Sequence, residues 1–169
     1  MTCRGQHWRP AYVGIGSNLS DPATQVRKAF AALQKLPHSG FARCSALYRS
    51  APMGPPDQPD FLNAAAVVLT RLSPNELLRE LQAIEKAQGR QHETPQWGPR
   101  IIDLDLLVMG HVILEEEGLT IPHPGIAERN FVLFPLAEIA PGLLVPAMGS
   151  VQKLVAALGT TGPRIERID

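Results

Sequence analysis

The chain has 169 residues, enough for one domain with a sizeable hydrophobic core, and its 16 basic and 16 acidic side chains give a formal net charge of zero. This balance argues against a protein that mainly grips nucleic acid or an anionic membrane, because such proteins carry excess positive charge. Cys3 and Cys44 form no close pair, so neither a disulfide framework nor a zinc site is predicted. The sequence contains no signal-like apolar segment or membrane-spanning run, and we expect a cytoplasmic protein.

The N-terminal part predicts a strand followed by a helix. Residues 1–10 are expected to form a flexible extension, and residues 11–15 a short buried strand. Asp21 is placed to cap a helix that has Pro22 at its first position. The apolar residues of this helix recur with helical spacing, which predicts one buried stripe made of Val26, Ala29, Phe30 and Leu33.

The next segment predicts two strands joined by a loop. Residues 41–48 alternate in polarity well enough for a second strand. Residues 51–59 are rich in proline and glycine, which is typical of a loop. Residues 63–69 are then expected to form the third strand.

The second helix has the clearest local signals. Ser73, Pro74 and Glu76 form a capping box with a proline in the first turn, and Gly89 is typical of a helix C-terminus. The spacing of its apolar residues predicts an inward face made of Leu77, Leu78, Leu81 and Ile84.

A long polar loop over residues 90–100 follows this helix, and loops of this length in a compact domain are usually functional. After one further strand, residues 110–111 predict a tight turn, and residues 112–114 are expected to form the hairpin partner of that strand. The last helix is predicted over residues 151–158, with Ser150 as its cap.

This order of elements predicts an α+β fold. Strand, helix, two strands, helix and strand is the split βαβ pattern of a ferredoxin-like sandwich. We therefore expect one domain over residues 1–169, with a largely antiparallel sheet, helices packed on it and C-terminal additions. The helices are expected on one face of the sheet, which leaves the other face free for a site.

Residues 101–108 carry the strongest functional signal, an apolar run interrupted only by Asp103 and Asp105. Alternate residues of a strand share a face, so both carboxylates point one way, roughly 6.6 Å apart. That spacing suits two divalent cations about 4 Å apart. The alternative is a strand with one hydrated face, although Asp is disfavoured in strands. The opposite, apolar face is predicted to contain Ile102, Leu104, Leu106 and Val108.

The loop before this strand supplies cationic and aromatic side chains. Arg90 and Arg100 flank it, and His92 and Trp97 lie between them. Guanidinium groups suit triphosphate oxygens because they are planar, always charged and bidentate. Surface solvation is the alternative for each arginine alone, but their closeness to the two aspartates favours phosphate binding.

The segment Gly14–Asn18 reads Gly-Ile-Gly-Ser-Asn and does not satisfy the known phosphate-binding motifs. A dinucleotide fingerprint needs a third glycine where Leu19 stands, and a P-loop needs Gly-Lys-Ser/Thr. We interpret the segment as a strand end that turns into a capped helix.

Several further residues have an ordinary structural explanation beside a functional one. Gln82 and Glu85 fit the surface of their helix, and Phe61 fits a core. His123 lies between two prolines and is equally consistent with a phosphate ligand and a turn residue. Phe61 and Asn63 together, an aromatic and an amide, suit a flat heterocycle that needs stacking and hydrogen bonds.

These motifs together resemble the 6-hydroxymethyl-7,8-dihydropterin pyrophosphokinases of folate biosynthesis, and the resemblance covers nearly the whole chain. Its most specific part is Trp97–Asp105, which reads Trp-Gly-Pro-Arg-Ile-Ile-Asp-Leu-Asp. The other matching stretches are residues 12–19, 48–50, 57–63, 84–85, 89–90, 119–123 and 128–129.

The resemblance implies a ferredoxin-like enzyme that transfers pyrophosphate from ATP to the pterin hydroxymethyl group and releases AMP. It implies that Asp103 and Asp105 hold two Mg²⁺ ions and are catalytic together with Arg90 and Arg100. It implies an ATP site made of Gln82, Glu85, Arg90, Arg100, Leu106, Thr120, His123 and Arg129. It implies a pterin site made of Ser50, Met53, Phe61, Asn63, Trp97 and Phe131. We expect a monomer whose partners are these two small molecules, with no nucleic acid or membrane.

The chain departs from the family pattern at three positions. Many relatives carry arginines in the long loop where this chain has His92 and Gln96, and an arginine is frequent at the position of Gly125. These differences bear on closure of the long loop and on ATP affinity, and not on the aspartate pair. Two alternatives stay open from the residues alone: another two-metal phosphoryl- or nucleotidyl-transferring enzyme, and a non-catalytic module that binds RNA or a regulatory ligand.

Overall fold

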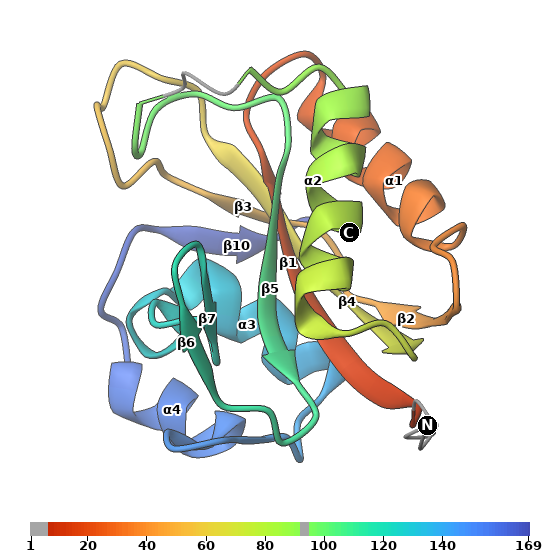
Figure 1. Ribbon diagram of the computed structural model, residues 1–169. Coiled ribbons are helices and arrows are strands. Elements are labelled where there is room, and N and C mark those ends of the chain that lie inside the picture. The colour runs from red at the N-terminus through yellow and green to blue at the C-terminus, as the bar shows by residue number, and fades with distance from the viewer. Residues whose placement is uncertain (1–6, 92–94) are drawn as a thin grey trace.

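The computed structural model describes residues 7–91 and 95–169, and a six-stranded antiparallel sheet lies at its centre (Figure 1). Neighbouring strands follow the order β10-β3-β4-β1-β5, and β2 pairs with another part of β4. Since β2 and β3 share one edge of β4, the strand order is that of a ferredoxin-like fold, which confirms the expected class. The strands are β1 (Arg9–Ser17), β2 (Ser39–Cys44), β3 (Tyr48–Ser50), β4 (Phe61–Thr70), β5 (Asp103–Met109) and β10 (Ile165–Arg167).

Two helices, α1 (Pro22–Leu33) and α2 (Pro74–Ala87), cover one face of the sheet (Figure 1). The main core lies between them and the strands, and Val26 and Leu77 are fully buried in it. The remaining residues of the two predicted stripes also lie in this core or pack against it. This helix layer covers the first face of the sheet, and the site lies on the second face.

The two helices begin differently. At α2, Ser73 Oγ accepts a hydrogen bond from the Glu76 backbone nitrogen, and the Glu76 carboxylate accepts one from the Ser73 backbone nitrogen, so the predicted capping box is confirmed. Asp21 precedes α1 as predicted, but its side chain makes no capping hydrogen bond. Its backbone has a φ of 60°, and its carboxylate accepts a hydrogen bond from Thr24 Oγ1 at 2.7 Å instead.

The strand predicted over residues 41–48 is interrupted between β2 and β3. Ser45 lies in the interruption, and its backbone nitrogen donates to the Ala65 carbonyl at 2.8 Å. The Ala65 nitrogen, in turn, donates to the Ser45 hydroxyl at 2.9 Å. A side chain thus replaces a backbone carbonyl in the ladder, which breaks the strand while keeping the chain along β4.

The second face of the sheet is partly covered, contrary to the expectation that it is free. α3 (Asn130–Ile139) packs on β4, and α4 (Val151–Leu158) packs on α3, so helices lie on both sides of the sheet (Figure 1). Leu107, Leu133 and Leu136 are buried in the core beneath them. α4 begins as predicted, with Ser150 Oγ accepting from the Lys153 nitrogen. The site occupies the part of this face beside α3.

Strand β5 departs from regular alternation. The first three residues of its predicted apolar face lie in the main core, but Val108 lies on the opposite side with Leu107. The pairing of β5 with β1 shifts register between Tyr12 and Val13, which leaves one extra residue on β5. The alternation therefore reverses, and the prediction for Val108 is wrong.

The hairpin partner predicted over residues 112–114 is also wrong. β6 (Leu114–Glu116) pairs with β7 (Leu119–Ile121) and not with β5. The short elements η1 (Ile126–Glu128), β8 (Leu144–Val145) and β9 (Gly149–Ser150) complete the C-terminal additions.

The flexible extension predicted over residues 1–10 is wrong for its last two residues. Arg9 and Pro10 belong to β1 and pair with Thr70 and Leu69, while residues 1–6 lie outside the described residues. Among the described helices, none is both long and apolar enough to cross a membrane.

Candidate active site

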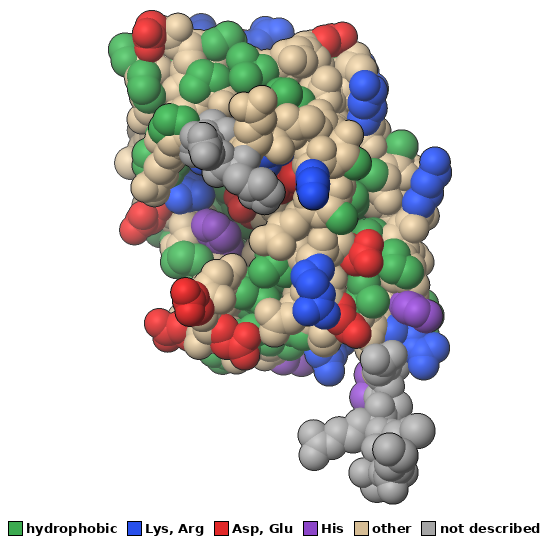
Figure 2. Space-filling model, turned by 45° about the horizontal axis from the view of Figure 1, so that its top comes forward, with side chains coloured by type: hydrophobic (Ala, Val, Ile, Leu, Met, Phe, Trp, Pro, Cys, Tyr) green, Lys and Arg blue, Asp and Glu red, His purple; other side chains and the backbone are tan. Residues whose placement is uncertain are grey.

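A cavity of about 250 Å³ lies on the second face of the sheet. β1 and β4 line it with Gly14, Gly16 and Asn63, and the start of α3 lines it with Phe131. The loop after β3 and the segment before β5 complete its walls. Figure 2 shows this hollow, with acidic, basic and histidine side chains around it. Charged and apolar groups therefore meet in one enclosed space.

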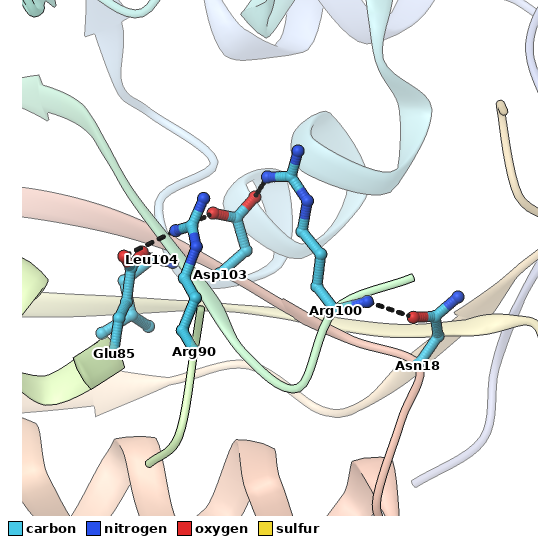
Figure 3. Close-up of polar contacts among 6 residues, drawn as sticks. All are labelled: Asn18, Glu85, Arg90, Arg100, Asp103 and Leu104. Atoms are coloured by element: carbon cyan, nitrogen blue, oxygen red, sulfur yellow. Dashed lines mark hydrogen bonds and ion pairs between the residues drawn. The ribbon is translucent and has the colours of Figure 1, made fainter. Parts of the chain in front are cut away.

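Asp103 is held between two arginines at the start of β5 (Figure 3). Arg90 Nη1 lies 2.8 Å from Asp103 Oδ1, and Arg100 Nη1 lies 3.0 Å from Asp103 Oδ2. All three side chains are partly buried, so solvent screens their attraction less than at an open surface. The structure thus brings together three of the four residues predicted to be catalytic.

Glu85 reaches this cluster from α2. Its Oε2 lies 2.5 Å from Arg90 Nη1, and its Oε1 accepts a hydrogen bond from the Leu104 backbone nitrogen at 2.7 Å. Burial raises the pKa of this carboxyl, while the Leu104 and Arg90 contacts act in the opposite direction. Glu85 therefore connects α2 to the first residues of β5 and orients Arg90 from behind the cavity.

Asp105 lines the cavity two residues beyond Asp103, as the strand alternation predicts. Burial is the largest cause that raises the pKa of Asp105 to about 7, and the negative charges of Asp103 and Glu85 contribute to the same rise. Arg129 and Arg100 lower it, but by less. The two arginines therefore do not fully offset the cost of an ionised Asp105 at this buried position.

The donor set fits hard divalent cations. Asp103 and Asp105 offer oxygen atoms to the same cavity, and cations beside them would offset their mutual repulsion. Within residues 7–91 and 95–169 no third His, Cys, Asp or Glu completes a metal-binding group with them. Mg²⁺ tolerates this arrangement, because it binds through one or two carboxylates together with phosphates and water.

The other end of the cavity is aromatic. Phe61, Phe131 and Met53 line it, and Asn63 lies among them. Asn63 Nδ2 donates to Ser50 Oγ at 2.8 Å and to the Tyr48 carbonyl at 3.2 Å. The amide is therefore fixed by β3, and five predicted pterin residues line this cavity.

Trp97, the sixth, lies over the cavity in a constrained position. Its backbone has a φ of 66°, and its carbonyl accepts a hydrogen bond from Gln58 Nε2 at 2.8 Å. Gly54 approaches this carbonyl so closely that a Cβ atom at residue 54 would overlap it. The Trp97 ring lies against the guanidinium of Arg129. Two loops, before α3 and before β5, thus meet above the site.

His123 lies at the cavity with a fixed orientation. Its backbone nitrogen donates to the Leu107 carbonyl at 2.8 Å, and its Nδ1 accepts from the Gly125 nitrogen at 3.0 Å. Burial lowers its pKa, and the positive charge of Arg129 lowers it further. With Nδ1 accepting, a neutral ring carries its proton on Nε2, which can donate to an anionic ligand.

Five predicted ATP residues are not among those that line the cavity, and two of them, Glu85 and Arg90, belong to the Asp103 cluster instead. Gln82 is exposed on α2, Thr120 is exposed on β7, and the Leu106 side chain is buried in the main core. Gln96 lines the cavity, whereas His92 lies outside the described residues.

Asn18 has a positional role that the motif analysis missed. Its side-chain Oδ1 accepts a hydrogen bond from the Arg100 backbone nitrogen at 2.8 Å, and the Asn18 backbone nitrogen donates one to the Arg100 carbonyl at 3.0 Å. Its Nδ2 donates to Gln58 Oε1 and to the Pro59 carbonyl, both at 3.0 Å. One buried amide therefore joins the loop after β3 to the segment before β5. An asparagine at the end of a buried strand, next to glycine and serine, was the available signal.

The chain matches known proteins over most of its length. The family model described as 7,8-dihydro-6-hydroxymethylpterin-pyrophosphokinase (HPPK) matches residues 12–141. A 2-amino-4-hydroxy-6-hydroxymethyldihydropteridine pyrophosphokinase of Haemophilus influenzae is 45% identical over 145 residues, which is 86% of this chain and 90% of that protein. Its namesake in Pseudomonas aeruginosa is 44% identical over 157 residues, 93% of this chain and 95% of that protein.

Solved structures with a similar fold include longer proteins. The crystal structure of wild-type Plasmodium falciparum HPPK-DHPS with pteroate superposes with a TM-score of 0.69 at 14% identity, and covers 89% of this chain and 42% of that one. At this identity the similarity supports the fold alone. From the sequence matches, the chain belongs to the 7,8-dihydro-6-hydroxymethylpterin-pyrophosphokinase family, whose reaction transfers pyrophosphate from ATP to the pterin hydroxymethyl group in folate biosynthesis.

Proposed function

We propose that the cavity holds the pterin at its aromatic end and the ATP triphosphate at its cationic end, with two Mg²⁺ ions on Asp103 and Asp105 between them. The observation that carries this assignment is that the two carboxylates line one cavity together with two arginines and two phenylalanines, namely Arg100, Arg129, Phe61 and Phe131. A primary alcohol on the pterin and the β-phosphorus of ATP would then meet beside the carboxylates.

The residues at the cationic end suit phosphate binding. Arg90 and Arg100 flank Asp103, and Arg129 and His123 line the same cavity. Pyrophosphoryl transfer depends mainly on positioning and on neutralising charge on the phosphate oxygens, and fixed guanidinium groups do both. Bound Mg²⁺ would supply further neutralisation of the same oxygens. Gln82, Glu85, Leu106 and Thr120 remain predicted members of the ATP site.

The residues at the aromatic end suit a flat heterocycle. Phe61 and Phe131 would stack on its two sides, and Asn63, Ser50 and Met53 would contact its edge. Because Asn63 Nδ2 is committed to β3, its Oδ1 is the atom offered to a pterin donor. Trp97 would close the top of this site.

We further propose that the enzyme acts as a monomer in the cytoplasm on these two small molecules. The balanced charge of the chain favours neither nucleic acid nor membrane as a partner. Sedimentation at micromolar concentration tests the monomer directly, since a dimer would sediment at about twice the mass.

Product analysis tests the reaction. The protein is incubated with ATP, Mg²⁺ and 6-hydroxymethyl-7,8-dihydropterin, and the nucleotide product is identified by chromatography. AMP in equal amount to the pterin diphosphate is the expected result. ADP would indicate an ordinary kinase, and no nucleotide product would indicate a binding module. A reaction without pterin controls for ATP hydrolysis.

A further inference from the structure

Asn130 is a buried polar residue that the proposed reaction does not use. It is the first residue of α3, between Arg129 and Phe131, and only 4% of it is exposed. Its Nδ2 donates to the Pro163 carbonyl at 2.8 Å, whereas its Oδ1 has no hydrogen-bond partner among the described residues. A buried amide with an unpartnered oxygen is unfavourable for stability, so packing alone explains it poorly.

The segment that Asn130 holds continues into the opposite wall of the cavity. The Arg164 carbonyl accepts a hydrogen bond from the Ala51 nitrogen at 3.0 Å, and Ile165 in β10 pairs with Ser50 in β3. Ser50 and Ala51 both line the cavity. Figure 1 shows the chain running from α4 past α3 to β10, beside β3.

The contact leaves little space for a larger residue at position 162 of the held segment. Gly162 has a φ of 114°, and a Cβ atom built on it would lie 3.0 Å from Asn130 Nδ2. The close approach at residue 162 and the hydrogen bond at residue 163 therefore fix the C-terminal segment against the first turn of α3.

We propose that Asn130 is a positioning residue for the pterin site, because it ties the wall that carries Phe131 to the wall that carries Ser50 through residues 162–165. This inference rests on the proposed pterin site. The spacing of the two walls then depends on one side-chain hydrogen bond. The Asp103 cluster of the phosphate end, formed with Glu85, Arg90 and Arg100, has no hydrogen bond or ion pair with Asn130 in the described part of the chain and does not depend on that bond.

Replacing Asn130 by aspartate tests this role with little change in shape, because it removes the donor to Pro163. We expect N130D to bind 6-hydroxymethylpterin about ten-fold more weakly, while a non-hydrolysable ATP analogue with Mg²⁺ binds within about two-fold of the wild type. The matched control is N75D, because Asn75 Nδ2 donates to Glu116 at an exposed position on α2. This control should leave both affinities unchanged.

Two further variants separate the possible failures. G162A keeps the asparagine but crowds its contact with the held segment, and should give the same split between pterin and ATP, read on folded protein by calorimetry. Unchanged pterin affinity, or equal losses for both ligands, in N130D and G162A would overturn the positioning role. F131A reports on the proposed site itself: if F131A also binds pterin normally, the pterin is elsewhere, whereas a loss in F131A with none in N130D contradicts only the role of Asn130.

Discussion

The guanidinium carbon of Arg129 lies 4.8 Å from the centre of the Trp97 ring, so a side chain at the start of α3 stacks on the segment before β5. Arg129 is also a predicted phosphate ligand, so the Trp97 ring and the triphosphate both attract its guanidinium. A stack of this kind contributes about 0.5–1 kcal/mol where it is partly solvated. A triphosphate offers the guanidinium charge-assisted hydrogen bonds that are stronger.

We therefore expect ATP to draw Arg129 away from Trp97. In a W8F background, where Trp97 is the remaining tryptophan, addition of an ATP analogue with Mg²⁺ should change the emission of Trp97. In W8F/R129Q the free protein should already show altered emission, and the analogue should change it little. An equal response with and without Arg129 would show that the stack is not exchanged for phosphate.

The aromatic pair should affect one substrate and not the other. F61A and F131A are each expected to weaken pterin binding by roughly 1–3 kcal/mol, the magnitude found when an aromatic that stacks on a base is removed. ATP affinity should hardly change, because a phenyl ring offers no group that binds phosphate. Calorimetry with each ligand separately measures this, and similar losses for both ligands would argue against the sandwich.

Tyr48 and Glu138 predict a pH dependence outside the site. Tyr48 Oη donates to Glu138 Oε2 at 2.6 Å, and burial, followed by this hydrogen bond and the charge of Glu138, raises the pKa of Tyr48 from 10.0 to about 12. The folded state therefore keeps the proton more strongly than the unfolded state. This contribution to stability is complete below pH 10 and is lost as the pH rises toward 12.

Absorbance at 295 nm measures this titration, and the difference between wild type and Y48F isolates Tyr48 from Tyr12. E138Q should lower the midpoint, because it removes the carboxylate charge while keeping the side-chain shape. A Tyr48 midpoint near 10 in the wild type, or no shift in E138Q, would be inconsistent with the contact.

The helix caps offer a paired stability test. S73A should lower the free energy of unfolding by about 1 kcal/mol, since the backbone nitrogen of Glu76 loses its acceptor. The hydrogen bond from the Ser73 backbone lowers the pKa of Glu76, so its contribution is present above pH 4.5 and is lost as the pH falls through the lowered pKa. S150A removes a cap without an acidic partner and serves as control. Urea unfolding at pH 7 and pH 4 measures how the free energy of unfolding depends on pH. This dependence should be smaller in E76Q than in the wild type and unchanged in S150A.

Local patterns predicted much of this fold because their causes are local. The capping box at Ser73 and the alternation around Asp103 each depend on residues only a few positions apart in the sequence. Both are found as predicted. The bulge that moves Val108 to the other face depends on how β5 pairs with β1, and no residue in β5 specifies it. The position of α3 is likewise set by packing on β4 and not by a polar stripe of its own.

The candidate site divides in the same way. The aspartates were predictable, because charge in an apolar run is unusual wherever the run lies, and the arginines were predictable because they flank a long polar loop next to that run. Asn18 was not, because its partners Gln58 and Arg100 are 40 and 82 residues away along the chain. Only the folded chain shows that this amide joins two loops, so a motif comparison limited to Gly14–Asn18 could not assign it.

The measurement that tests the central assignment most directly is AMP formation by D103N and D105N at several Mg²⁺ concentrations. Both substitutions keep the side-chain shape and remove a charge that the proposed site uses to hold Mg²⁺. We expect each variant to stay folded by circular dichroism and to lose about 100-fold or more in kcat/KM, which corresponds to several kcal/mol of charge stabilisation in the transition state. Excess Mg²⁺ should not restore the rate. A folded D103N or D105N that retains half of the wild-type rate would contradict the two-metal site.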